Sequence, residues 1–532
     1  MSPSRMLERQ VRYLFVVAGG LGFAALGLAQ QPADPAPRPT FRAAVDTVTL
    51  TVTVLDRNRR PVRGLSAADF TVLDEGEPRP IVAVEMIEVP PVRPPSRTVW
   101  QDQVVADVVT NESRPGRLVV LFFDRSMTAG WEVDRARKIA ARTINELGPD
   151  DLAAVVYNYN LATPINFTAD RRRLLDALNS PVLGTQKYPP PGPKSSGDCF
   201  CGLCGVESLE QVAKALEPVS NRPKMVVYIG SWIPLVESPA DPCAEWLEPA
   251  TARMFYAAQR AQVIIHPVDS SGVRTPAGFA ASERTVRPND GGPNFDSLRR
   301  LAENTGGRTI LGNNAPERDV PRLFEESAVS YLIGFTPRAS RGDGRPQRVR
   351  VRVRGDDLTV LAASSYRHAP AADDPPPPGA GATPPPSSNA RAIAGLTPLA
   401  DIELRAAAFA VPAPGASDRT AVATVLGIHL PLESAGATPV TAQVDVTAFD
   451  TLGRPHDTDH QTMTLTPRIG ATRLDWEVLS RLDLPKGRYE IRAAVSSAAP
   501  ALTGSVHTFL DIGNVGKTSL AVSGLMLHTE AA

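Results

Sequence analysis

Residues 118–128 are Leu118-Val119-Val120-Leu121-Phe122-Phe123-Asp124-Arg125-Ser126-Met127-Thr128, a continuous apolar run joined to a short polar segment. An apolar run that does not alternate with polar residues is typical of a strand covered on both faces. Between residues 133 and 147, apolar residues recur at helical spacing, and Gly148-Pro149 ends that pattern. The sequence therefore predicts a buried strand that carries Asp124 at its carboxyl end, followed by an amphipathic helix.

The same alternation of strands and helices continues to about residue 330. Solid apolar strands are expected at 152–156, 224–229 and 263–265, and amphipathic helices at 171–178, 245–262, 295–304 and 321–330. Solid strands that alternate with helices are typical of a parallel sheet with helices on both sides. The expected fold class is therefore α/β, with a doubly wound, mostly parallel sheet of Rossmann-like type.

Modules rich in β-strands are expected on both sides of this α/β region. Residues 41–95 contain runs in which apolar and polar residues alternate, and they predict a small N-terminal β module. The α/β domain is expected to span 116–368, with β-strands at its end. A Pro-rich linker at 369–395 then leads to a C-terminal β-sandwich of immunoglobulin-like type at 396–525.

The first residues, 1–29, are expected to be a signal peptide. Arg5, Arg9 and Arg12 precede an uncharged apolar run, and small residues then allow cleavage before Gln30. The run is shorter than the ~20 residues that a membrane-spanning helix needs, and an uncleaved anchor is the alternative. No later segment is long and apolar enough to span a bilayer. The mature protein is therefore expected to be secreted, or to lie in the periplasm or cell envelope.

The overall composition is that of a large globular chain with several domains. Of the 532 residues, 42% are apolar, which is ample for buried cores, and the net charge is −1. A chain without excess charge gives no electrostatic reason to expect nucleic acid or an anionic membrane as a partner. The 51 prolines, about twice the average usage, indicate linkers and β-rich modules.

Four cysteines, Cys199, Cys201, Cys204 and Cys243, are candidates for disulfide bonds. In an oxidising compartment an even number of cysteines predicts disulfides. A zinc site is the alternative, but a CxxC that overlaps a CxC, with a single distant fourth cysteine, matches zinc-ligand spacing poorly. We expect one or two disulfides, with Cys243 bonded to the 199–204 cluster and the individual pairing left open.

Asp124, Ser126 and Thr128 form a candidate cation site. In sheets of the expected type, ligands bind just outside the carboxyl ends of the strands. One carboxylate and two hydroxyls at alternating positions supply the oxygen ligands that a hard divalent cation needs. This D-x-S-x-T spacing, after a buried strand and before a long helix, resembles the metal-ion-dependent adhesion site of von Willebrand factor type A (VWA) and integrin inserted domains.

The resemblance to VWA domains covers residues 41–368. The segment 298–307, LRRLAENTGG, resembles a helix-to-glycine pattern late in those domains. The segments GLSAADFTVLDEGEPRPI at 64–81 and YLIGFTP at 331–337 are similar to the lead-in and the final strand of the VWFA-related acidobacterial domain family. The resemblance implies a VWA-like sheet, and it implies Thr168 as the second-loop ligand of the metal site.

Ser231 departs from the VWA pattern. The strand at 225–229 runs into Gly230-Ser231-Trp232, whereas the family usually has Ser-Asp-Gly, with an aspartate that completes the metal site. A neutral hydroxyl thus replaces a carboxylate, and cation affinity depends on the charge of the ligands. We expect Mg²⁺ or Mn²⁺ to bind weakly or not at all at the implied ligand set Asp124, Ser126, Thr128, Thr168 and Ser231.

The resemblance implies a binding function. We expect an extracytoplasmic protein-interaction or adhesion protein with a degenerate metal-ion-dependent adhesion site. If a cation binds, an acidic side chain from a partner protein would fill its open position. Trp131, Trp232 and Trp246 lie near the site loops, either as exposed contact residues or buried under the cysteine-bearing loop.

Two alternatives remain open. A metal-independent envelope scaffold would use none of these ligands, and the missing aspartate at Ser231 favours it. An α/β hydrolase would use Ser231 as nucleophile together with Asp124 and His266. The chain has neither a G-x-S-x-G elbow nor an H-E-x-x-H motif. We therefore expect that the protein is not an enzyme.

Overall fold

The computed structural model of the chain describes residues 47–89, 108–112, 116–124, 127, 130–158, 160–179, 197–219, 222–235, 243–273, 295–339, 345–368, 386–411, 419–432, 439–451, 453–467 and 472–513. Within these ranges, the side chains of 160–165 and 197–204 are left undescribed. The predicted signal peptide at 1–29 lies outside the described residues. Within the described ranges, no helix has both the length and the hydropathy to cross a membrane.

The predicted fold class is wrong. Strands contribute more residues than helices to the described chain, and four of its five sheets are antiparallel. Parallel pairing is confined to one five-stranded sheet, which is itself mixed. The α/β interpretation failed because it gave most weight to the alternating strands and helices in the middle of the chain. The described residues are therefore mostly β, and a doubly wound parallel sheet does not organise them.

The mixed sheet has the strand order β10-β9-β6-β7-β8. Its strands are β10 (Val263–Val268), β9 (Lys224–Ile229), β6 (Leu118–Phe123), β7 (Leu152–Tyr157) and β8 (Asn160–Thr168). The first four pair in parallel, whereas β8 follows β7 closely and returns antiparallel to it. The carboxyl ends of four neighbouring strands therefore meet at one edge of this sheet.

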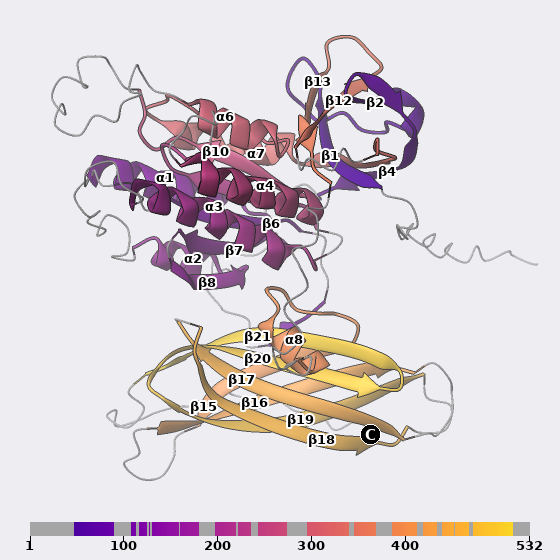
Figure 1. Cartoon of the computed structure of the whole chain (residues 1–532). Helices are drawn as coiled ribbons and strands as arrows, with labels where there is room; N and C mark the ends of the chain where they lie inside the picture. Colours follow the sequence, from indigo (N-terminus) through magenta and orange to yellow (C-terminus); the bar gives the residue numbers. More distant parts are fainter. Residues whose placement is uncertain are drawn as a thin grey trace, which may run out of the picture. The chain divides into compact units, whose positions relative to one another are not determined.

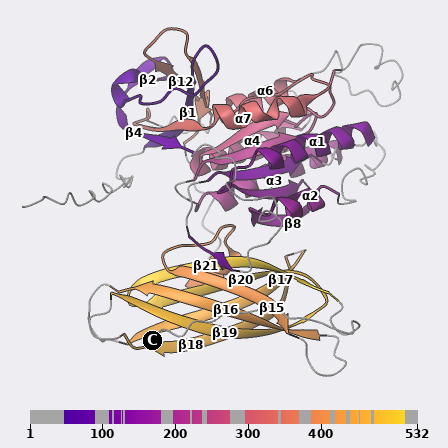
Figure 2. The ribbon, with the colours of Figure 1, turned by 180° about the vertical axis from the view of Figure 1, so that it is seen from behind.

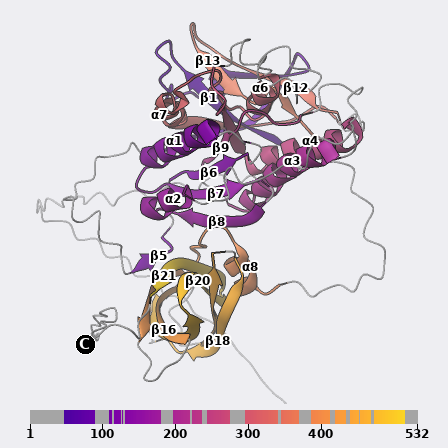
Figure 3. The same ribbon diagram turned by 90° about the vertical axis from the view of Figure 1, so that its left-hand side faces the viewer.

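Helices cover both faces of the mixed sheet. Every residue of β6 and β9 is buried, so both strands are apolar on either side. Figure 3 shows α1 and α2 on one side of the strands and α3 and α4 on the other. The helices of this region are α1 (Gly130–Glu146), α2 (Arg171–Ala177), α3 (Gly197–Leu216), α4 (Ala244–Ala261), α6 (Asp296–Glu303), α7 (Val320–Glu326) and the 3₁₀ turn η3 (Pro316–Arg318).

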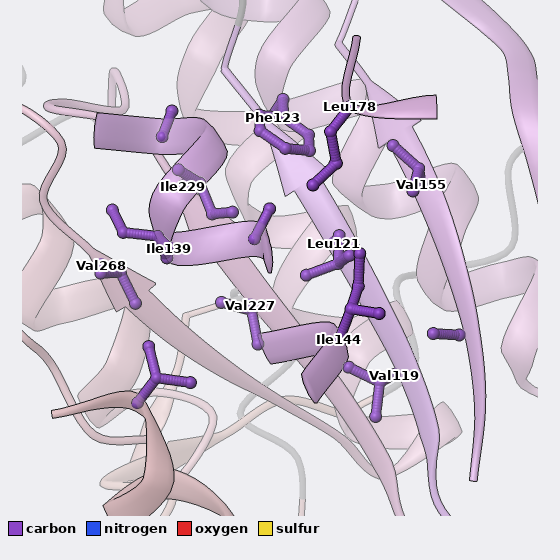
Figure 4. Packing of buried hydrophobic residues seen from close by; sticks show 14 of the residues in the cluster. Val119, Leu121, Phe123, Ile139, Ile144, Val155, Leu178, Val227, Ile229 and Val268 are labelled. Atoms are coloured by element: carbon purple, nitrogen blue, oxygen red, sulfur yellow. The ribbon is translucent and has the colours of Figure 1, made fainter. Parts of the chain in front are cut away.

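The core under α1 holds β6 in place. Leu121 and Phe123 of β6 share one cluster of buried side chains with Ile139 and Ile144 of α1, as Figure 4 shows at close range. Burial of each such side chain stabilises the fold by about 1.5–3 kcal/mol. The strand that leads to Asp124 is therefore anchored along its length.

The predicted N-terminal β module is not separate from the last strands of the predicted α/β domain. β1 (Val48–Leu55) pairs with β11 (Val329–Phe335), so that Val48 lies opposite Phe335. The sheets β13-β1-β11-β4 and β14-β12-β2-β3 share one apolar core, and Figure 1 shows their strands together. Their other elements are η1 (Ala67–Asp69), β2 (Phe70–Asp74), β3 (Glu77–Arg79), β4 (Ile81–Glu88), β12 (Gln347–Val353), β13 (Thr359–Ala362) and β14 (Ser365–Tyr366). Alternation in the sequence predicts a half-buried strand but does not identify its partner.

Two further antiparallel sheets, β19-β16-β15-β5 and β18-β17-β20-β21, enclose a core of their own. Figure 2 shows β15, β16 and β19 side by side. One edge strand, β5, comes from a much earlier part of the chain and pairs with β15. The strands are β5 (Val109–Thr110), β15 (Glu403–Val411), β16 (Arg419–Pro431), β17 (Val440–Asp450), β18 (Pro455–Leu465), β19 (Arg473–Pro485), β20 (Gly487–Ala498) and β21 (Ala501–Ile512).

A short helix, α8 (Ser388–Ala394), occupies the end of the range predicted as a Pro-rich linker. Its first turn is capped by Ser387, whose Oγ accepts a hydrogen bond of 3.1 Å from the backbone N–H of Ala390. Ile393 is buried in a small cluster with Ala494 of β20. The rest of the predicted linker, 369–385, lies outside the described residues.

Candidate functional site

Asp124 lies at the carboxyl edge of the mixed sheet, directly after β6. It is 4% exposed, and its backbone N–H donates a hydrogen bond of 2.9 Å to the carbonyl oxygen of Ile229. Its Oδ1 accepts a hydrogen bond of 2.8 Å from Nδ2 of Asn158, the residue that follows β7. The backbone of Asp124 is thus held by β9 and its side chain by the residue after β7, which fixes the carboxylate at this edge.

Gly230 leaves room for that carboxylate. Its backbone N–H donates to the carbonyl oxygen of Val268 at 3.2 Å, which ties the end of β9 to β10. A Cβ on Gly230 would lie 2.7 Å from Cβ of Asp124 and 3.3 Å from its Oδ2. Only glycine allows this approach, so the segment that carries Ser231 runs close beside Asp124. Ser231 itself is half-buried.

Asp269, directly after β10, organises the neighbouring loop. It is fully buried, and its Oδ1 accepts from the backbone N–H and the hydroxyl of Ser271 at 2.8 and 2.6 Å. Its Oδ2 accepts from the backbone N–H groups of Gly272 and Gly312, both at 3.2 Å. Four donors thus occupy the carboxylate, so Asp269 shapes the loop and does not offer a ligand to a cation.

Only one residue of the predicted motif loop after Asp124 is described. Met127 is 2% exposed, and its Sδ accepts a hydrogen bond of 3.2 Å from the hydroxyl of Ser270, beside Asp269. This contact ties the motif loop to the end of β10. The predicted ligands Ser126 and Thr128 lie outside the described residues.

Thr168 lies at the opposite end of the sheet from Asp124. Because β8 runs antiparallel to β7, Thr168 pairs with Ala153 near the amino end of β7. Ala153 is level with Val119 on β6, whereas Asp124 follows Phe123. The four-residue step from the level of Val119 to that of Phe123 corresponds to about 13 Å along a strand. The assignment of Thr168 as a ligand beside Asp124 is therefore wrong.

Thr168 instead helps to begin α2. Its Oγ1 accepts a hydrogen bond of 3.0 Å from the backbone N–H of Asp170, the N-cap residue of that helix. The resemblance misled the prediction because the hairpin of β7 and β8 reverses the chain before residue 168. Asn158, at the start of that hairpin, occupies the place beside Asp124.

The described residues at this edge supply some, but not all, of the oxygen ligands that a divalent cation needs. Asp124 offers one carboxylate, and Ser231 brings a hydroxyl on the adjoining segment. Within the described residues, no three His, Cys, Asp or Glu side chains gather where they could hold a metal ion. Oxygen ligands with a single formal negative charge bind hard cations weakly.

The residues of the hydrolase alternative do not come together. His266 lies within β10, level with Val227 of β9, whereas Ser231 follows the end of β9. The four residues from Val227 to Ser231 span about 13 Å in an extended chain. Burial lowers the pKa of His266 to about 4, and its Nδ1 accepts the backbone N–H of Arg308 at 3.0 Å. The ring is thus a buried core group and not a base beside Ser231.

Three tryptophans surround this edge and are exposed to solvent. Trp131, Trp232 and Trp246 are 54%, 39% and 47% exposed, so the alternative in which they are buried is wrong. Trp131 is the second residue of α1, Trp232 follows Ser231, and Trp246 lies in the first turn of α4. Both helices connect parallel strands, and such helices begin at the carboxyl edge of the sheet. The guanidinium of Arg135 lies 5.2 Å from the centre of the Trp131 ring.

Cys243 is disulfide-bonded and forms the N-cap of α4. The side chains of Cys199, Cys201 and Cys204, near the start of α3, lie outside the described side chains. α3 and α4 pack against each other. The link from Cys243 to the 199–204 cluster remains a prediction.

Sequence reasoning missed Asn158 and Asp269. Each directly follows an apolar strand of the mixed sheet, as Asp124 does. The rule that ligands bind outside the carboxyl ends of parallel strands points to both residues. Asp269 was missed because the predicted strand ended at residue 265, and Asn158 because the resemblance directed attention to Thr168.

Comparisons with known proteins leave the family open. No protein-family model and no curated protein matches the chain. The pilus adhesin SpaC from Lactobacillus rhamnosus GG is 10% identical over 83% of this chain and 56% of its own, with a TM-score of 0.25. The putative ApaA protein from Bordetella pertussis is 15% identical over 22% of this chain and 96% of its own, with a TM-score of 0.14. A β-glucosidase from Listeria innocua in complex with isofagomine is 9% identical over 81% of this chain and 48% of its own, with a TM-score of 0.14. Similarity at this level carries no argument about fold or function.

Proposed function

We propose that this chain is an extracytoplasmic protein-interaction protein whose binding face is the carboxyl edge of the mixed sheet. The observation that carries the proposal is the fixed carboxylate of Asp124, which Asn158 holds and Gly230 accommodates at that edge. The resemblance of residues 41–368 to the VWA family is part of the proposal and rests on the sequence motifs alone.

The chemistry of the edge favours recognition through a weakly held divalent cation. Asp124 supplies one negative charge and Ser231 a neutral hydroxyl, so Mg²⁺ or Mn²⁺ bound there retains most of its positive charge. A cation in this state attracts a further oxygen ligand that carries a negative charge. A glutamate or aspartate side chain of a partner protein has that chemistry.

The exposed tryptophans supply the apolar part of the proposed contact. Trp131 and Trp232 flank the segments that carry Asp124 and Ser231, and both retain a large exposed fraction, 54% and 39%. Tryptophan is enriched among the residues that contribute most to protein–protein binding, because a large ring buries much area at little entropic cost. A carboxylate-binding centre with aromatic residues around it suits a protein partner better than a small polar ligand.

Manganese binding to the full chain tests the cation step. Binding of Mn²⁺ is measured by electron paramagnetic resonance for the wild type and for Ser231→Asp, Asp124→Asn and Thr168→Ala. Ser231→Asp adds the second negative charge, and we expect it to tighten binding at least tenfold. Asp124→Asn should abolish binding. Thr168→Ala should leave it unchanged, because Thr168 lies at the other end of the sheet.

A labelled glutamate-containing peptide then tests the recognition step. We expect it to bind the wild type in Mg²⁺ but not in EDTA, and to bind Ser231→Asp more tightly. Trp232→Ala should weaken the peptide without changing Mn²⁺ affinity. If neither the wild type nor Ser231→Asp binds Mn²⁺, the cation mechanism is wrong, and the single formal charge at Asp124 then favours the metal-independent scaffold.

A further inference from the structure

The sheet β14-β12-β2-β3 carries a row of arginines on its solvent face. Along β12, buried side chains that face the core alternate with exposed side chains. The exposed side chains of this strand are all arginine, and the alternation continues one residue beyond its end. The row consists of Arg348, Arg350, Arg352 and Arg354. These four residues are termed the arginine row, and the proposed binding face at Asp124 uses none of them.

The pairing of β12 with β2 fixes the spacing of the arginine row. The two strands pair without a bulge from Val349 to Val353. The backbone N–H of Arg354 then donates a hydrogen bond of 2.8 Å to the carbonyl oxygen of Asp69, which extends the regular backbone to the last residue of the row. Residues two apart in a strand lie about 6.7 Å apart and point to the same side. The row therefore presents four positive charges at even intervals over about 20 Å.

The two central arginines of the row are not neutralised. Arg350 lies opposite Leu73 and Arg352 lies opposite Thr71, so that the neighbouring strand places uncharged side chains beside both. Within the part of the chain that the structure describes, neither guanidinium forms an ion pair or a hydrogen bond. The middle of the row therefore offers two exposed positive charges with all their donors available.

The carboxylates that interact with the row lie at its two ends. Nη2 of Arg348 lies 3.3 Å from Oε2 of Glu75, but 85% of the Arg348 side chain is still exposed. At the other end, hydrogen bonds from Ser66 and, to a smaller extent, the charge of Arg354 lower the pKa of Asp69. Each end of the row thus has an acidic neighbour, whereas its centre has none.

An acidic peptide in an extended conformation fits this row. In such a peptide, alternate side chains project to one side with the same repeat of about 6.7 Å, so acidic residues at every second position would meet successive arginines. A guanidinium can bind a carboxylate through two parallel hydrogen bonds. Leu73 and Pro78, which pair across β2 and β3, add apolar surface on the same face. The net charge of −1 gives the whole chain no long-range attraction for a nucleic acid, so a short acidic segment of a protein fits the row better.

We propose that the arginine row is a second interaction surface, which binds an extended segment of a partner protein that carries acidic residues at alternate positions. Arg350 and Arg352 contribute most to this contact, because the protein itself gives them no carboxylate. The contact needs no divalent cation and is therefore independent of the chemistry at Asp124. A row that only prevented the sheet from pairing with other chains would need positive charge, but it would not need a partner whose charges match its spacing.

Two fluorescent peptides of identical composition test the match in spacing. The alternating peptide is Glu-Thr-Glu-Thr-Glu-Thr-Glu, and the grouped peptide is Glu-Glu-Glu-Glu-Thr-Thr-Thr. Binding to the full-length protein is measured by fluorescence anisotropy at low salt in EDTA, which removes any contribution from a cation at Asp124. We expect the alternating peptide to bind about fivefold more tightly than the grouped one, and its affinity to fall as salt is added.

Substitutions then locate the contact. Arg350→Gln combined with Arg352→Gln should weaken the alternating peptide about tenfold. Arg172→Gln combined with Arg318→Gln removes the same charge at exposed arginines of α2 and η3 and should leave its affinity unchanged. Lysine at both central positions keeps the charge and should give an affinity between those of the wild type and the glutamine variant.

Three results would overturn the proposal. The first is equal affinity of the wild type for the two peptides, which needs no variant and so stands even if a substituted chain does not fold. The second is an unchanged affinity of the alternating peptide for the variant with glutamine at Arg350 and Arg352. The third is tighter binding of a single-stranded DNA with the same number of charges, which would make a nucleic acid the better partner.

Discussion

Acid should destabilise the region around the mixed sheet through His266. The ring is buried, and burial lowers its pKa from 6.5 to about 4. Its Nδ1 accepts the backbone N–H of Arg308, so a proton on that nitrogen would break the bond. In the unfolded chain the same histidine takes up a proton near pH 6.5. As the pH falls from 6.5 towards 4, the unfolded state therefore binds a proton at His266 that the folded state does not bind. The free energy of unfolding decreases across this range.

The size of the loss follows from the two pKa values. A tenfold difference in proton affinity is worth about 1.4 kcal/mol, so the difference between 6.5 and about 4 amounts to about 3 kcal/mol once the pH lies well below both values. Between pH 7 and pH 4.5 the loss is about 2 kcal/mol by the same relation. A loss of that size is a large fraction of the 5–15 kcal/mol that typically stabilises a protein.

His266→Asn isolates this contribution. The side-chain oxygen of asparagine can stand near Nδ1 and accept from Arg308, but it does not titrate. The wild type and the variant are unfolded with urea at pH 7 and pH 4.5, with Trp fluorescence as the signal. We expect the variant to lose about 2 kcal/mol less than the wild type between pH 7 and pH 4.5. His507, which burial also shifts, to about 3, is present in both proteins and cancels. Equal losses in the two proteins would refute the reasoning.

Three further predictions follow from single contacts. A Cβ on Gly307 would lie 1.8 Å from the carbonyl oxygen of Ile265; we therefore expect Gly307→Ala to abolish soluble expression, whereas Gly513→Ala, with open space around it, expresses normally. Cys243→Ser removes a disulfide and should lower stability in the absence of reductant by about 2–4 kcal/mol; equal melting temperatures of wild type and variant contradict this. Asp269→Asn places an amide donor against backbone N–H groups and should cost about 2 kcal/mol, measured by urea unfolding at pH 7; an unchanged midpoint would show that the loop does not depend on the carboxylate.

Local structure could be predicted well from the sequence. The expected strands at 118–123 and 224–229 are the observed β6 and β9, and the expected helix at 245–262 is α4 within one residue. These patterns are local, because solid apolar runs and helical spacing arise from the burial of each segment itself. The place of Asp124 at the end of β6 followed from the same signal.

The candidate site could be predicted only in part. Asp124 and the segment of Ser231 lie at one edge because both follow parallel strands. Thr168 was placed there by resemblance, and the hairpin of β7 and β8 carries it to the other end. The chain reverses its direction between β7 and β8 because these two strands pair as a hairpin. The spacing of apolar residues does not predict that pairing.

The sequence by itself determined several of the strands and helices, among them β6, β9 and α4, and the place of Asp124 after β6. It did not predict α3, β8 or α8. The tertiary structure alone decided that β1 pairs with β11 and that the described strands pair mostly antiparallel. The physical reason is that the periodicity of apolar side chains indicates which face of a segment is buried, but not which other segment covers that face. Which strand it pairs with depends on contacts between residues far apart in the chain. The local pattern of apolar residues does not specify those contacts.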